Sequence, residues 1–146
     1  MVRHDFKLVS PYREILHSDA TKPFENELFP DGHVLADLIA HNTGNSYVIV
    51  YDDNDDILSF MWFYDHGSYF YIEFIATNRK FNSKFRSSSR LIDLLVGIGK
   101  ELKYKKIELL ALEDSISFYR KHGFDFVGDA VTGNYGIMSK MTKSLS

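Results

Sequence analysis

The chain has 146 residues, of which 45% are hydrophobic and 25% charged, so it can bury the core of one globular domain and is not a disordered protein. It has no cysteine, which excludes disulfide bonds, thiolate zinc sites and a cysteine nucleophile. The net charge of −3 argues against a general nucleic-acid-binding protein. The chain contains neither a signal-peptide pattern nor an apolar run of the roughly 18 residues that a membrane span needs, so we expect a cytoplasmic protein without membrane contact.

The first forty residues give the weakest signals for regular structure. We expect a short strand over Asp5–Val9 and two helical pieces, one near Pro11–Ser18 and one over Gly32–His41. In the second piece, apolar residues recur at the spacing of one helix face: Val34, Leu35, Leu38 and Ile39.

Three closely spaced strands are predicted in the middle of the chain. They cover Tyr47–Tyr51, Ile57–Tyr64 and Tyr69–Ala76, and the polar segments Asp52–Asp56 and Asp65–Ser68 form the turns between them. Apolar and polar residues do not alternate strictly along these strands, which is typical of central strands with both faces covered. We therefore expect helices on each side of the sheet.

A helix is predicted after the next polar loop, because apolar residues again recur along one face: Leu91, Leu95, Ile98 and Leu102. Ser88 or Ser89 would cap its start. Gly97 and Gly99 each weaken a helix interior by about 1 kcal/mol. Small residues at these positions would, however, let the helix approach the sheet closely.

The last part of the chain is predicted to contain three strands and a short helix. The strands cover Lys106–Leu112, Phe124–Gly128 and Gly136–Met141, and the helix covers Asp114–His122 and ends at Gly123 in the left-handed conformation. Three hairpin-linked strands followed by a strand–helix–strand crossover require a mixed sheet. No repeat or linker interrupts this order, so residues 1–146 are expected to form one α/β domain.

The charges are segregated along the chain. Ser46–Ala76 carries six acids and no Lys or Arg, whereas Arg79–Lys106 carries nine bases and two acids, a net charge of +7. Such a basic segment suits a polyanionic ligand, although a solvated surface explains part of it.

Two stretches resemble the GNAT superfamily of N-acetyltransferases. Ser115–Phe124 matches the family's short-helix signature of a Phe-Tyr pair followed after three residues by Gly-Phe, and Arg90–Leu109 tracks its coenzyme-binding helix and the next strand. Gly136–Met141 suits its last strand. The resemblance implies a single-domain acyl-CoA N-acyltransferase fold with a mixed central sheet of six to seven strands and about four helices. It also implies an acetyl-CoA-dependent enzyme that acetylates a primary amine of a small molecule or a protein.

One segment departs from the family pattern. The family's phosphate loop reads Gln/Arg-x-x-Gly-x-Gly/Ala, whereas this chain has Ser83 at the first position, Arg86 at the first glycine and Ser88 at the last small residue. Glycine lets a backbone approach phosphates closely, and serine hydroxyls can donate to phosphate instead. The alternative is a polar, basic loop with a serine cap and no ligand.

The resemblance implies a coenzyme site between two strands and at the start of the following helix. The coenzyme would lie where Tyr69–Ala76 splays from Lys106–Leu112, with its phosphates at the helix N-terminus. The residues implied to bind it are Ile75, Ala76, Thr77, Lys84, Phe85, Arg86, Ser87, Ser88, Ser89, Arg90 and Ser115.

Catalysis of acetyl transfer needs a group that deprotonates the amine and a group that protonates the departing thiolate. Tyr119 occupies the position of the family's acid, with simple packing as the alternative. Glu73, the only acid in its strand, is the candidate base that deprotonates the amine; the alternative is that it is simply a solvent-facing strand residue. Glu108 on the next strand is the second candidate base. Water can also deprotonate the amine in place of a side chain.

The six histidines show no metal-binding spacing, so we expect no metal site. Acids in the early helices and in Ser46–Ala76 favour a cationic acceptor. A second interpretation is a catalytically silent binding or assembly protein that retains the fold, supported by the missing glycines and by a composition that suits a phage-encoded protein. A third is a dimeric regulatory module whose aromatic strands form the interface, which leaves a homodimer open.

Overall fold

The computed structural model describes residues 3–27, 29, 33–82, 84–133 and 136–146. Within them, eight strands form one sheet in the order β1-β2-β3-β4-β5-β8-β6, and β7 also pairs with β8. The strands are β1 Tyr12–Glu14, β2 Ser46–Asp53, β3 Asp56–Asp65, β4 Tyr69–Thr77, β5 Lys106–Leu112, β6 Asp125–Phe126, β7 Val131–Gly133 and β8 Gly136–Ser144. Among the strand pairs of the described residues, only β4–β5 is parallel, so the sheet is mixed as predicted.

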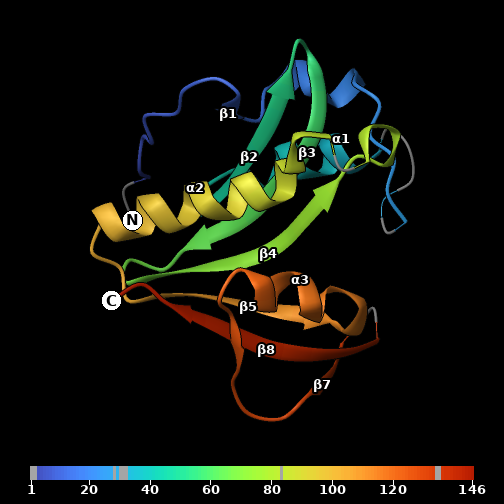
Figure 1. Cartoon of the computed structure of the whole chain (residues 1–146). Helices are drawn as coiled ribbons and strands as arrows, with labels where there is room; N and C mark the ends of the chain where they lie inside the picture. The colour runs from blue at the N-terminus through green and yellow to red at the C-terminus, as the bar shows by residue number, and fades with distance from the viewer. Residues whose placement is uncertain (1–2, 28, 30–32, 83, 134–135) are drawn as a thin grey trace.

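Helices cover both faces of this sheet (Figure 1). On one face lie α2 Ser87–Glu101 and α3 Ile116–Lys121, and on the other lies α1 His33–His41. The α/β fold class predicted from the sequence is confirmed. We expected six to seven strands and about four helices. The described residues form eight strands, three α-helices and four short 3-10 turns, and the strands that were not predicted are the short β1 and β7.

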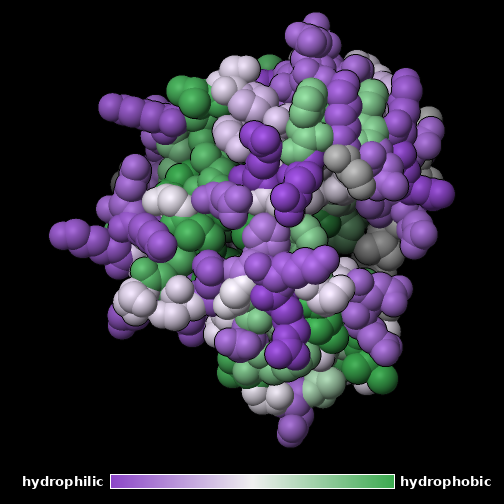
Figure 2. Space-filling view, viewed as in Figure 1, coloured by the Kyte–Doolittle hydropathy of each residue, from purple (hydrophilic) through white to green (hydrophobic). Residues whose placement is uncertain are grey.

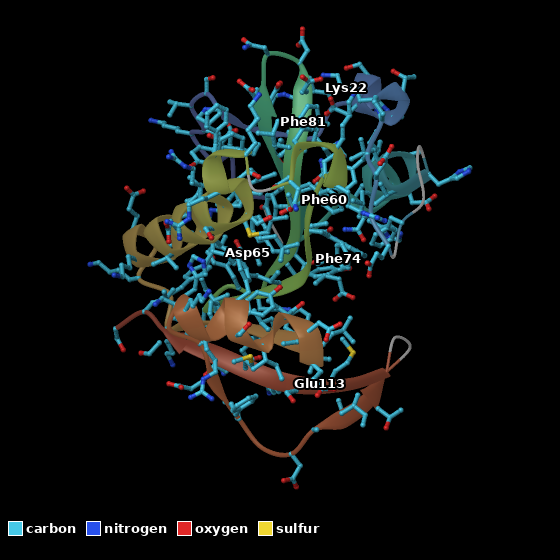
Figure 3. All side chains as sticks on the ribbon, turned by 45° about the vertical axis from the view of Figure 1, so that its right-hand side comes forward. Lys22, Phe60, Asp65, Phe74, Phe81 and Glu113 are labelled. Atoms are coloured by element: carbon cyan, nitrogen blue, oxygen red, sulfur yellow. The ribbon has the colours of Figure 1, made fainter. Side chains whose placement is uncertain are left out.

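Each face of the sheet has its own apolar core. Leu91, Ile92 and Leu95 of α2 pack in one cluster with the inward side chains of β2–β5, whereas Val34 and Leu35 of α1 belong to the other. In the second cluster, Phe60 and Phe74 of β3 and β4 stack with ring centroids 5.9 Å apart (Figure 3). Because both faces are covered, β2 and β3 are almost continuously buried, which explains their lack of strict alternation.

The predictions for the N-terminal segment were wrong. Asp5–Val9 forms no strand, and Phe6 instead packs its ring on Tyr47 at 4.9 Å. Pro11–Ser18 is not helical: β1 pairs antiparallel with β2, and a 3-10 turn follows over His17–Thr21. Arg13 fixes this path, because its guanidinium donates two hydrogen bonds of 2.7 and 2.8 Å to the buried Asp19. The long-range pairing of β1 with β2 outweighs the local preference for a helix.

The two glycines of α2 differ in their surroundings. A Cβ added at Gly99 would lie 2.5 Å from Leu145 and 3.5 Å from the Phe70 ring, so this glycine permits the close approach of helix and sheet. Gly97 is exposed, and no atom would lie within 4 Å of a Cβ there. The expected close approach of the helix to the sheet is therefore found at Gly99 and not at Gly97.

The C-terminal elements follow the expected order with shifted ends. The helix predicted over Asp114–His122 is a 3-10 turn, Glu113–Ser115, followed by α3, and Gly123 has the expected positive φ of 86°. The strand predicted over Phe124–Gly128 is reduced to β6. Apolar side chains are visible over the C-terminal strands in the lower part of Figure 2. Among the residues of β7 and β8, Val131 and Ile137 are large, apolar and exposed.

Candidate active site

The two central parallel strands separate halfway along their length. β4 and β5 pair from Tyr69 with Lys106 to Ile72 with Leu109, and beyond that point they no longer pair with each other. Each strand stays paired with its other neighbour: β4 pairs with β3 as far as Thr77, and β5 pairs with β8 as far as Leu112. The sheet therefore opens into a wedge (Figure 1), and a cavity of about 650 Å³ lies there.

The walls of this cleft come from six parts of the chain. They are Asn26, Glu27 and Phe29 before α1; Trp62 of β3; Ile72, Glu73, Phe74, Ile75, Arg79 and Asn82 of β4 and its following loop; Leu110, Ala111, Leu112, Asp114 and Ser115 of β5 and its following turn; Tyr119 of α3; and Met138 of β8. Apolar and aromatic groups form much of the lining. The charged members are three acids, Glu27, Glu73 and Asp114, and one base, Arg79.

Tyr119 lies at the cleft wall but is only 7% exposed. Its ring is held by edge-on contacts with Phe118 and Phe124, at centroid distances of 5.2 and 5.8 Å. Burial raises the pKa of the Tyr119 phenol well above its ordinary value. The hydroxyl is protonated near neutral pH, as an ordinary phenol is, and it can act as a proton donor, although the raised pKa makes it a weaker acid.

The two candidate bases occupy different environments. Glu73 is exposed and lines the cleft. Glu108 is buried, accepts a 2.6 Å hydrogen bond from Lys106 and lies 3.6 Å from Lys140. Burial pushes the pKa of Glu108 upward, but the two lysines outweigh it and hold that pKa below its usual value. Glu108 is also absent from the cleft lining, so of the two acids only Glu73 is placed to meet an amine.

The loop before α2 keeps an unusual backbone without glycine. Phe85 and Arg86 both have positive φ angles, 56° and 49°, and α2 begins at Ser87 with Arg86 as its N-cap. The prediction that Ser88 or Ser89 caps the helix was therefore wrong. Left-handed backbone is the conformation that glycine adopts without penalty, and other residues adopt it at a cost of about 1 kcal/mol.

Hydroxyl groups attach the first turn of α2 to the sheet. The Ser59 Oγ of β3 hydrogen-bonds the buried Ser87 Oγ and lies 3.1 Å from the Ser88 Oγ. Ser88 also hydrogen-bonds Thr77 of β4. The Ser87 and Ser88 hydroxyls thus face the sheet, and the Thr77 hydroxyl faces α2. Ser59 was not found from the sequence, because nothing in the pattern of β3 marks a residue that reaches a helix 28 positions later.

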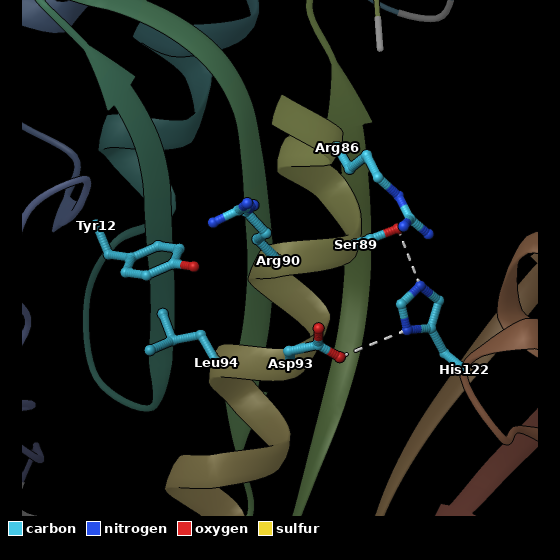
Figure 4. A pocket seen from close by; sticks show the side chains of 7 residues that line it. All are labelled: Tyr12, Arg86, Ser89, Arg90, Asp93, Leu94 and His122. Carbon is cyan, nitrogen blue, oxygen red and sulfur yellow. Dashed lines mark hydrogen bonds and ion pairs between the residues drawn. The ribbon is translucent and has the colours of Figure 1, made fainter. Parts of the chain in front are cut away.

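The basic residues of the loop and of the first turn of α2 have three different roles. Lys84 Nζ lies 2.8 Å from Asp53 of β2. Arg90 Nε donates a 2.8 Å hydrogen bond to the Phe85 carbonyl. Arg86 and Arg90 line a second cavity, of about 510 Å³, on the outer face of α2 (Figure 4). The Phe85 ring lies near Tyr51, at 6.5 Å between centroids, and lines neither cavity.

The remaining predicted site residues are divided between cleft, core and outer cavity. Ile75 and Ser115 line the cleft, and Ser89 lines the outer cavity. Ala76 is buried in the core on the α1 side. Among the described residues, no cluster of three acids or histidines is arranged to hold a metal ion, and none of the described helices is long and apolar enough to span a membrane.

Comparison with known proteins gives a family match and a set of fold neighbours. The model of the Acetyltransferase (GNAT) family matches residues 10–124. No curated protein sequence matches significantly. The ribosomal-protein-S18-alanine N-acetyltransferase from Escherichia coli superposes with a TM-score of 0.72 at 11% identity, covering 92% of this chain and 93% of that one.

Two further solved structures have related folds and contain a coenzyme. An aminoglycoside 6′-N-acetyltransferase complexed with coenzyme A gives a TM-score of 0.64 at 13% identity, over 77% of this chain and 79% of that one. A GNAT family acetyltransferase from Elizabethkingia anophelis with acetyl-CoA bound gives 0.59 at 17% identity, over 74% and 82%. At these identities the likeness shows the fold.

Proposed function

The chain belongs to the GNAT acetyltransferase family, and from that premise we propose that it transfers the acetyl group of acetyl-CoA to a primary amine of a small molecule or a protein. The observation that carries the proposal is the wedge between β4 and β5 with Tyr119 at its wall. Beyond Ile72, the edge of β4 that faces β5 has no partner strand among the described residues. Its backbone groups are therefore available to the amide groups of a coenzyme arm.

The residues around the wedge fit an acetyl-CoA molecule. The acetyl end would enter the cleft beside Ile75 and Ser115, and the pyrophosphate would meet the first amides of α2. Among the described residues of that loop, Phe85 and Arg86 do not line the cleft. Arg86 and Arg90 add positive charge at the same end of the helix. Two proteins of related fold carry coenzyme A or acetyl-CoA, which supports this placement.

The reaction requires two proton movements. The neutral amine attacks the thioester carbonyl, so a C–N bond forms and the C–S bond breaks. The amine gives up a proton to Glu73, directly or through water, and the coenzyme thiolate takes one from the Tyr119 hydroxyl. Burial disfavours the phenolate that this transfer leaves, so Tyr119 takes a proton back from solvent after each turnover, while Glu73 releases to solvent the proton that it took from the amine.

The charge of the cleft favours a cationic acceptor. Glu27, Glu73 and Asp114 outnumber Arg79 along its lining, so the potential there attracts an ammonium group. Phe29, Trp62 and Phe74 add apolar surface on the α1 side of the cleft. We propose that the acceptor approaches from this side, opposite to the coenzyme phosphates.

Release of the free coenzyme thiol in the presence of acetyl-CoA and a panel of amines tests the proposal. In Tyr119→Phe we expect kcat to fall at least about 100-fold with little change in KM for acetyl-CoA. Tyr71→Phe is the matched control: the pKa of Tyr71 is also raised by burial, to about 12, but Tyr71 does not line the cleft. Equal activity of the two variants would remove Tyr119 from the mechanism. Coenzyme binding without turnover of any amine would favour a catalytically silent protein.

A further inference from the structure

The outer cavity on α2 contains a histidine that the proposed reaction does not use. His122, at the end of α3, places its Nε2 3.1 Å from the Ser89 Oγ and its Nδ1 3.7 Å from the Asp93 carboxylate. Figure 4 shows the ring between these two groups, with the Arg86 side chain on the same side and Arg90 directed toward Tyr12. The imidazole is 14% exposed, whereas Asp93 is 75% exposed. A partly buried ring thus faces a cavity lined by two guanidinium groups.

The charges around His122 come from every element packed against it. Asp93 and Arg86 approach from α2 and its cap, and Lys143 approaches from β8. Burial lowers the pKa of His122, Lys143 and Arg86 lower it further, and Asp93 opposes them. The imidazole is therefore neutral near pH 7 while the cavity is free of an anion.

The hydrogen bond to Ser89 links this ring to the cavity. With Nδ1–H directed at Asp93, the unprotonated Nε2 accepts the Ser89 hydroxyl proton. When Nε2 gains a proton, it donates to the Ser89 oxygen instead. The serine O–H is then free to turn toward an anion in the cavity. Protonation of His122 therefore adds a positive charge and also releases a hydroxyl donor.

We propose that this cavity binds the phosphate monoester at the nucleotide end of the coenzyme, and that His122 takes up a proton as the phosphate binds. The inference rests on the proposed function. The pyrophosphate is assigned to the α2 amides, so the outward cavity is left for the terminal phosphate. A dianion beside Arg86 and His122 favours the protonated imidazole, and each charged hydrogen bond that it gains strengthens the complex.

The sign of the pH effect follows from this coupling. Binding raises the pKa of His122 from its lowered value in the free protein. The additional affinity is fully present below the free-state pKa and is lost as the pH rises through the pKa of the complex. The ionisation of the phosphate works in the opposite direction, because its second proton, with a pKa of about 6, neutralises part of the ligand in acid. Tighter binding at lower pH must therefore come from the protein.

Calorimetry with coenzyme A and dephospho-coenzyme A tests the proposal. We expect the wild type to bind coenzyme A about tenfold more tightly near pH 6 than near pH 8. His122→Gln, which keeps a polar partner for Ser89, should lose this difference. Dephospho-coenzyme A retains the pyrophosphate but lacks the phosphate monoester, so its affinity for either protein should not differ in this way between pH 6 and pH 8. Titrations of the wild type in two buffers of different ionisation enthalpy should show net proton uptake, a measurement that needs no variant.

The possible outcomes distinguish a failure of this inference from a failure of the proposed acetyltransferase function. The same pH dependence in wild type and His122→Gln, or no proton uptake, would overturn the role of His122 and leave the acetyltransferase proposal standing. An equal pH effect with dephospho-coenzyme A would overturn the assignment to the phosphate monoester. Absence of coenzyme binding at every pH, at millimolar concentration, would overturn the inference together with the proposed function.

Discussion

The two faces of α2 have different chemical tasks. On the inward face, Ser87 hydrogen-bonds a hydroxyl of the sheet and Leu91 packs in the apolar core. Gly99 lies on the same face, where an added Cβ would meet the Phe70 ring. The outward face carries Arg86 and Ser89, which line an open cavity. The difference shows that the residues that attach α2 to the sheet are not the residues that give its N-terminal end a positive charge. Because inward hydroxyls hold the first turn, the residues that face outward are free to be basic.

Gly99→Val should have the largest effect, and it tests whether the inward face is filled to its limit. A valine at this position would overlap Leu145 and press on the buried Phe70 ring, so we expect a loss of about 2 kcal/mol in the free energy of unfolding. Gly97→Val, on the exposed side of the same helix, is the control and should leave stability within about 0.5 kcal/mol. Urea denaturation of both variants measures the difference. Equal losses would show that helix propensity, and not packing, decides both positions.

Ser59→Ala tests the hydroxyl attachment. The change leaves the buried Ser87 hydroxyl without its Ser59 partner, which should lower the free energy of unfolding by about 1–2 kcal/mol. In a double-mutant cycle, the additional loss on adding Ser87→Ala should be smaller than the loss caused by Ser87→Ala alone. Strict additivity of the two losses would mean that the two hydroxyls do not stabilise each other.

Arg86→Gln tests the outward face, where we expect an effect on binding and none on stability. The variant should bind acetyl-CoA about fivefold more weakly, because it loses a charge at the phosphate end, and its melting temperature should stay unchanged. Lys84→Gln is the matched control, since Lys84 already pairs with Asp53 and should affect affinity less. Calorimetric titration at low ionic strength gives both affinities. A stronger effect of Lys84 would place the phosphates on the other side of the loop.

Gly97→Ala should have the smallest effect, and it should be favourable. The position is exposed inside α2 and has open space for a methyl group, so alanine should raise the free energy of unfolding by about 0.5–1 kcal/mol through its helix propensity. Acetyl-CoA affinity should be unchanged, because Gly97 lines neither cavity. Thermal denaturation measures the gain. A loss of stability would indicate an unrecognised contact on the outward face.

The sequence was sufficient where structure is determined locally. The bounds of β5 were predicted correctly. The helices α1 and α2 were found from their helical periodicity, and the strands β2–β4 were found from apolar runs between turn residues. The path of β1 could not be predicted, because it depends on pairing with β2 and on the hydrogen bond from Arg13 to Asp52. Such contacts join residues whose proximity exists only after folding.

The candidate site shows the same division between local and long-range information. The resemblance of Ser115–Phe124 to the family motif placed Tyr119, and the structure puts it at the cleft wall. Ser59 and His122 were missed, since they meet α2 from β3 and from the end of α3, across 28 and 33 positions of sequence. A histidine without metal-binding spacing gives no pattern that distinguishes it from the other five.

The left-handed residues Phe85 and Arg86 have a consequence for the entropy of binding. A pair of glycines at these positions would leave the loop many conformations, in the unfolded chain and in the free protein. Residues with side chains sample fewer, and the hydroxyl contacts of Ser87 and Ser88 hold the next turn in place. A ligand that needs this shape therefore meets a preorganised receptor and loses less binding energy to ordering it.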